Sequence, residues 1–122
     1  MNNNRLFTLE TTPIEIIAGD TVEIPYQALK RNGDIVNLRS PDTEIEWRLS
    51  PYDCLGVVVC TKKLSDGQID LSDDDVDCFS VVLFPEDTED LMGLHTYQII
   101  ITDPSGAVNR KVQGNIHIWQ RN

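Results

Sequence analysis

Three apolar runs decide the fold: Phe79-Ser-Val-Val-Leu-Phe84, Tyr97-Gln-Ile-Ile-Ile-Thr102 and Gly114-Asn-Ile-His-Ile-Trp119. Each run has the length of a β-strand and is rich in β-branched or aromatic residues. Turn-forming residues separate the runs, with Pro85 and Gly93 in the first gap and Asp103-Pro-Ser-Gly106 in the second. We therefore expect consecutive antiparallel strands, in which the segment from Asp77 to Phe84 pairs with the run that follows it.

The rest of the chain repeats this pattern of short apolar runs between turns. Alternation places Val22, Ile24, Tyr26 and Ala28 on one face of a strand, while Pro25 on the other face indicates an edge or a bulge. Further strands are expected at Arg5–Glu10, Ile14–Ile17, Ile35–Leu38, Thr43–Leu49, Val57–Lys63 and Gln68–Leu71, with turns at Ala18–Thr21, Lys30–Asp34, Ser50–Asp53 and Ser65–Gly67. One helical turn within Glu86–Met92 is the only helix that the spacing predicts.

These elements predict an all-β fold. About seven to nine short strands at regular spacing favour an immunoglobulin-like antiparallel sandwich of two sheets, with a small barrel as the alternative. The chain has 122 residues, which suits a single domain over residues 1–122. Ile45, Trp47 and Leu49 alternate with charged residues, so we expect Trp47 in the core.

The charge and the termini narrow the classes of partner. Twenty acidic and ten basic residues give a net charge of −10, which disfavours nucleic-acid binding. The N-terminus has no secretory signal and the longest apolar run, Leu55–Cys60, is too short to span a bilayer. We expect synthesis in the cytoplasm and no contact with a membrane. Cys54, Cys60 and Cys78 have no zinc-site spacing and are expected to be free thiols, with a Cys60–Cys78 disulfide as the alternative.

No motif points to catalysis. The acidic run Asp70–Asp77 lacks the spacing and the glycine of an EF-hand loop, so we interpret it as a solvated loop, with calcium binding as the alternative. His95 and His117 have no metal-ligand spacing and are expected on the outward faces of strands. Nucleophile-elbow and phosphate-loop motifs are missing as well. The sequence therefore predicts no enzyme, no metal site and no cofactor.

The last strand offers a candidate interface. Gly114–Trp119 is predicted to be an edge strand, and an edge presents unpaired backbone groups to a partner. No proline blunts it, and Trp119 is an aromatic residue of the kind that anchors interfaces. We therefore expect Ile116, Ile118 and Trp119 to contact a second copy or another protein, unless the N-terminal segment around Leu6–Leu9 covers this strand.

Several stretches in order resemble the N-terminal immunoglobulin-like domain of phage baseplate upper proteins and related prophage structural proteins of Gram-positive hosts. They are Ala18–Thr21 with the alternating strand after it, Gly33–Leu38 before Thr43–Trp47, Phe84–Thr88 with Leu91–Gly93 and Tyr97–Ile101, and Asp103–Gly106 before Gly114–Ile118. The resemblance implies a non-enzymatic virion building block of the baseplate or tail type, whose partners are other virion proteins or itself. It also implies a virion-associated location.

A second function class stays open at this point. An immunoglobulin-like module of a bacterial protein can bind a ligand such as a carbohydrate on exposed aromatic side chains. Trp119, Tyr52 and Trp47 would then have to line one surface.

Overall fold

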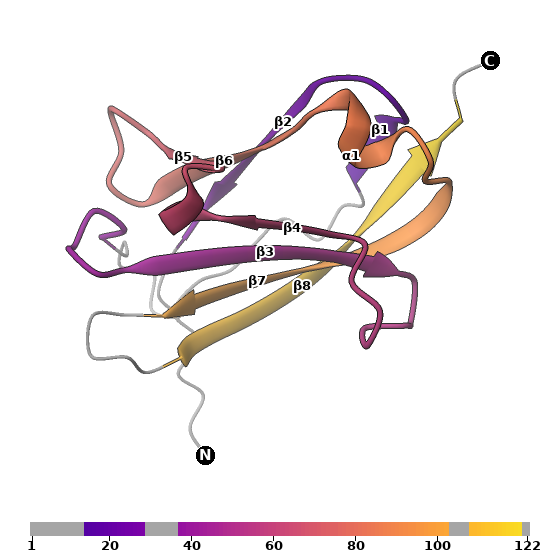
Figure 1. The fold of residues 1–122 in the computed structure, drawn as a ribbon. Helices are drawn as coiled ribbons and strands as arrows, with labels where there is room; N and C mark the ends of the chain where they lie inside the picture. Colours follow the sequence, from indigo (N-terminus) through magenta and orange to yellow (C-terminus); the bar gives the residue numbers. More distant parts are fainter. Residues whose placement is uncertain (1–13, 29–36, 103–107, 121–122) are drawn as a thin grey trace.

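A computed structural model describes residues 14–28, 37–102 and 108–120; for residues 108–112 it describes the backbone alone. Short extended runs dominate it (Figure 1). The strands are β1 (Ile14–Ile17), β2 (Val22–Gln27), β3 (Glu44–Pro51), β4 (Cys60–Lys63), β5 (Ile69–Leu71), β6 (Cys78–Leu83), β7 (Gly93–Thr102) and β8 (Val108–Trp119), and the helical pieces are η1 (Leu64–Asp66) and α1 (Pro85–Thr88).

The strands form two sheets, which confirms the predicted sandwich. One sheet has the order β1-β8-β7-β3-β4 and the other the order β2-β6-β5. All neighbours are antiparallel except β1 and β8, which are parallel. An immunoglobulin sandwich likewise divides its strands into a B-E-D sheet and a G-F-C sheet that C′ can extend. The fold is therefore immunoglobulin-like, with β1 placed on the edge of the larger sheet.

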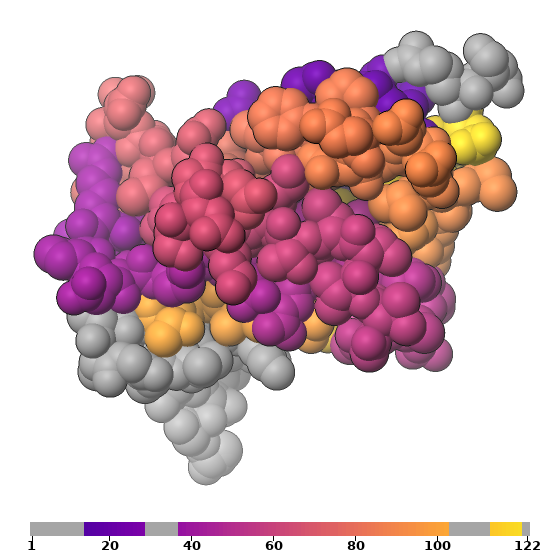
Figure 2. Space-filling model, viewed as in Figure 1, coloured from indigo at the N-terminus to yellow at the C-terminus, as the bar shows by residue number. Residues whose placement is uncertain are grey.

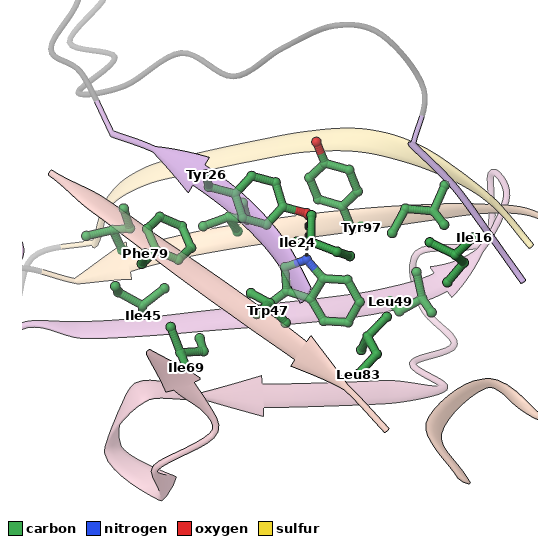
Figure 3. Packing of buried hydrophobic residues seen from close by; sticks show 14 of the residues in the cluster. Ile16, Ile24, Tyr26, Ile45, Trp47, Leu49, Ile69, Phe79, Leu83 and Tyr97 are labelled. Atoms are coloured by element: carbon green, nitrogen blue, oxygen red, sulfur yellow. Dashed lines mark hydrogen bonds between the residues drawn. The ribbon is translucent and has the colours of Figure 1, made fainter. Parts of the chain in front are cut away.

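Aromatic rings fill the space between the sheets (Figure 3). Trp47 on β3 is fully buried, and its indole N–H donates to the Tyr26 hydroxyl on β2 at 3.1 Å. Ring centroids lie 5.4 Å apart for Tyr26 and Phe79 and 6.4 Å apart for Trp47 and Tyr97. Burial, together with Tyr97 beside it, raises the pKa of Tyr26, so this hydroxyl stays neutral. The prediction that Trp47 packs in the core is confirmed.

The position of β6 differs from the prediction. It pairs with β2 and β5 instead of with β7, which lies in the other sheet. Pro85 begins α1, where a missing N–H costs nothing, and this single turn carries the chain from one sheet to the other. The predicted helical turn is thus confirmed with shorter bounds. The two later runs, β7 and β8, do pair antiparallel as expected.

Other boundaries are corrected in the same region of the larger sheet. Strand β3 continues through Pro51, which was expected in a loop. Strand β4 begins only at Cys60, so the valines at 57–59 lie outside the regular ladder. On β2, however, the buried face and the edge position of Pro25 are as predicted. The expected strands at 5–10 and 35–38, the hairpin at 30–34 and the turn at 103–106 lie wholly or mostly outside the described residues.

Within the described ranges, none of the helical segments is long and apolar enough to cross a membrane.

Candidate interaction surface

The three residues expected to form an interface do not lie together. Ile116 and Ile118 point into the core and are almost completely buried, whereas Trp119 is 50% exposed. The final part of β8 is also not an edge, because over Ile116–Ile118 β7 pairs with one side of it and β1 with the other. The covering strand is Ile14–Ile17, in parallel register with Ile116–Trp119. Of the predicted three, only Trp119 is available to a partner.

The two histidines differ from each other. His95 was expected to face outward, but it lies on the core side of β7 and is only 5% exposed, with its Nδ1 3.1 Å from the Gly93 carbonyl oxygen. His117 is on the outer face, where its ring meets that of Trp119 edge-on at a centroid distance of 4.0 Å. His95 has the same phase along β7 as Tyr97, Ile99 and Ile101, so the alternation of those residues places it on the core side.

The predicted loop Asp70–Asp77 is shorter in the structure: Asp70 and Leu71 belong to β5, and the loop that follows has one buried acidic residue. Asp73, Asp74 and Asp75 are exposed, while the Asp77 carboxylate is buried and accepts a hydrogen bond from Gln27 Nε2 at 2.8 Å. That bond lowers the pKa of Asp77. Across the three described ranges, no group of His, Cys, Asp and Glu side chains has the arrangement of a metal site.

All three cysteines are free thiols. Cys54 is exposed, and Cys60 and Cys78 are half-buried on different sheets. Burial raises the pKa of Cys60 to about 11, and the nearby Asp87 carboxylate acts in the same direction.

Exposed apolar side chains gather at one end of the sandwich. The described residues expose ten large apolar side chains, and all of them lie where β1, β3, β6 and β8 end and β7 begins: Ile17, Tyr52, Leu55, Val57, Val58, Val59, Phe84, Met92, Leu94 and Trp119. We call these ten residues the apolar end. In Figure 2 the segments 52–59 and 84–94 meet at the right-hand end of the view, beside the tip of β8. Scattered apolar residues need no explanation on a protein surface, but a concentration of this kind marks an interaction site.

Sheet register aligns part of the apolar end in rows on the outer face of the larger sheet. Ile17 is paired with Trp119, and His117 with Leu94. The Tyr52 amide donates to the Leu94 carbonyl at 3.1 Å, which extends the second row to the end of β3. Three strand spacings separate Ile17 from Tyr52, or about 14 Å. Backbone pairing therefore holds four apolar side chains at fixed positions: Ile17, Tyr52, Leu94 and Trp119.

The loop between β3 and β4 supplies four more of the apolar side chains: Leu55, Val57, Val58 and Val59. Val57 is 50% exposed, and the Val57 amide donates to the Cys54 carbonyl at 3.0 Å. The Val59 amide donates to the Leu49 carbonyl at 2.8 Å, so the loop is tied to β3 just before β4 begins. These backbone bonds keep the valines on the surface in a defined conformation.

A largely buried ion pair joins strand β4, which follows this loop, to α1. Lys62 Nζ on β4 lies 2.7 Å from the Asp87 carboxylate on α1, and Lys62 is only 5% exposed. The same carboxylate accepts the Phe84 amide at 2.7 Å, and the ammonium group lies 5.2 Å from the centre of the Phe84 ring. Such a pair is costly to break from one side, because the remaining charge stays buried. It therefore holds β4 and α1 in a fixed relation.

The exposed charges around the apolar end are acidic. Glu15 accepts a hydrogen bond from the Trp119 indole at 2.9 Å, and Asp53 follows Tyr52 directly. Glu86, Glu89 and Asp90 are exposed in and after α1. We call these five residues the acidic rim: Glu15, Asp53, Glu86, Glu89 and Asp90. Of the basic side chains that the structure describes, Lys62 and Arg48 lie nearest this end, and each is paired with a carboxylate, Lys62 with Asp87 and Arg48 with Glu46.

Sequence reasoning found Trp119 but missed most of the apolar end. The valines at 57–59 fall within the predicted strand Val57–Lys63, although a strand that is apolar on both faces needs cover on both sides. The exposure of Leu94 was not predicted, because it depends on which face of β7 points toward the core.

Comparison with known proteins identifies no family for this chain. No protein-family model matches the sequence, and no curated protein is significantly similar to it. Among solved structures, the fibronectin(III)-like modules of Clostridium thermocellum CbhA superpose on 96% of this chain and 100% of their own, with a TM-score of 0.47 and 12% identity. The chain is an immunoglobulin-like β-sandwich on the basis of its own strand order.

Proposed function

We propose that this chain is a non-enzymatic structural module of a phage or prophage virion, which acts through protein–protein contacts made by its apolar end. The sequence resemblance to baseplate-type domains supports the virion setting. The observation that carries the contact itself is the concentration of exposed apolar side chains at one end of a rigid sandwich.

The composition of the apolar end suits a contact with a protein. Tryptophan and tyrosine are enriched among the residues that contribute most to interfaces, and Trp119 and Tyr52 are about half exposed. Aliphatic side chains adjoin them, and the backbone bonds described above fix their positions before binding. A preformed surface loses less conformational entropy on association than a mobile one. The net charge of −10 limits non-specific association with other acidic proteins.

Carbohydrate binding has less support. That function required Trp47, Tyr52 and Trp119 to line one surface, and Trp47 is fully buried between the sheets.

Co-purification with the products of flanking genes tests the proposed function. We expect the chain to form a complex with at least one tail or baseplate product when the two are expressed together. A Val58→Ser, Leu94→Ser variant should lose that complex while keeping its β-sheet circular dichroism spectrum. Asp74→Asn, on an exposed loop residue at the other end of the sandwich, is the control and should keep it.

Two results would contradict the proposed function. One is a gene neighbourhood of polysaccharide enzymes together with specific retention on a polysaccharide column. The other is a complex with a virion protein that the Val58→Ser, Leu94→Ser variant forms as well as the wild type does.

A further inference from the structure

The charges around the apolar end carry information about what it binds. Exposed acidic side chains border the apolar surface, on β1, on the β3–β4 loop and after α1. The two described basic side chains nearest this end are already paired: Lys62 is buried against Asp87, and Arg48 lies 2.7 Å from the Glu46 carboxylate. Among the described residues, this surface therefore presents an apolar centre with unpaired acidic side chains around it.

The geometry points to a protein partner that carries an apolar patch bordered by lysine and arginine, and not to a second copy of this chain. This inference rests on the proposed function and adds the chemistry of the partner. Opposite charges at the border of an interface speed association and fix orientation. Each exposed pair contributes little by itself, so the apolar centre supplies affinity and the rim supplies selectivity.

A second copy is disfavoured by the same pattern. In a symmetric dimer the same patch faces itself, so the acidic rim of one copy would oppose the acidic rim of the other. The total charge of −10 per chain adds to that repulsion. A partner with basic residues around its apolar patch meets no such repulsion.

Matched probe peptides test the inference. Two short peptides share one leucine- and phenylalanine-rich core, and one carries lysines where the other carries glutamates. Binding is followed by the fluorescence of Trp119, since Trp47 is buried, and Trp119→Phe identifies the signal. We expect the lysine peptide to bind, the glutamate peptide not to bind, and added salt to weaken binding.

Two variants of equal charge separate the acidic rim from the overall charge. The rim variant is Asp53→Asn, Glu89→Gln, Asp90→Asn, and the control variant is Asp73→Asn, Asp74→Asn, Asp75→Asn at the far end. Both remove the same number of exposed acidic charges. We expect the rim variant to bind the lysine peptide about tenfold more weakly and the control variant to bind within about twofold of wild type. Val58→Ser, Leu94→Ser should abolish binding.

Several results would overturn the inference. They are equal losses in the rim and control variants, equal binding of both peptides, and no binding of either. A dimer in sedimentation that Val58→Ser, Leu94→Ser dissociates would assign the apolar end to a second copy. Failure of the proposed function looks different, because the lysine peptide would still bind while no virion protein co-purifies.

Discussion

Replacing Gly114 by alanine should destabilise the protein, because the Tyr97 ring occupies the space that a side chain would need. A Cβ built on Gly114 would lie 2.6 Å from Tyr97 Cζ and 2.8 Å from Cε2, and would also meet the hydroxyl. The ring cannot move away easily, since Trp47 and Tyr26 pack against it.

The size of the effect follows from two opposing terms. Alanine in a strand normally gains roughly 0.5–1 kcal/mol over glycine, while overpacking a core costs about 1–3 kcal/mol. We expect urea denaturation to show a net loss of about 1 kcal/mol, and thermal unfolding to shift down by about 4 °C.

Removing the ring provides the control for Gly114. In a Tyr97→Leu background the obstructing atoms are gone, so Gly114→Ala should there be neutral or slightly stabilising. The difference between the two backgrounds is the coupling energy of a double-mutant cycle. The reasoning is refuted if Gly114→Ala costs the same in both backgrounds or costs nothing in the wild type.

Three further predictions concern buried polar groups and thiols. Ser50 Oγ is buried without a hydrogen-bond partner, so Ser50→Ala should leave the stability unchanged or raise it by about 1 kcal/mol. Thr96→Val is the comparison: it removes the hydroxyl that donates to Asn115 Oδ1 at 3.3 Å, so it should lower the stability. A loss of stability on Ser50→Ala would show that the hydroxyl has a partner. Because the pKa of Cys60 is raised to about 11, only about one Cys60 side chain in a thousand is a thiolate at about pH 8. Alkylation of the native protein should therefore label the exposed Cys54 first, and all three thiols should react after denaturation. Equal labelling rates for Cys54 and Cys60, or fewer than three thiols after denaturation, would contradict this. The hydrogen bond from Gln27 lowers the pKa of Asp77 in the folded protein. The stability that the Asp77 carboxylate contributes is therefore present above its unfolded pKa and is lost as the pH falls below about 4. In urea titrations, Asp77→Asn should lose less stability on acidification than the wild type does, and an equal loss would count against the bond.

Local alternation predicted the strands well but not their neighbours. Residues 22–28 and 43–49 alternate cleanly, and the structure buries the faces that the pattern indicates. Alternation does not indicate to which sheet a strand belongs: β6 precedes β7 in the chain but lies in the other sheet. A proline-started turn joins strands within a sheet or between sheets equally well, so the sequence gives no sign of the crossing.

The candidate surface was harder to predict than the fold. Strand β8 was expected at an edge because it is last in the chain, yet β1 pairs with it in parallel from about a hundred residues away. A contact between such distant segments has no local sequence signature. The apolar end has the same origin: its ten side chains come from separate turns and strand ends, and only the folded arrangement brings them together.

Hydrogen exchange on a purified complex tests the central claim most directly. The complex is formed with a flanking-gene product that co-purifies with the chain. We predict slower amide exchange at 52–59, 92–94 and 117–119 on binding, and no change at the far-end loop 72–77. Protection confined to 72–77, or to the β4 and β5 edges, with no change in the first three segments would contradict the claim that the apolar end is the docking surface.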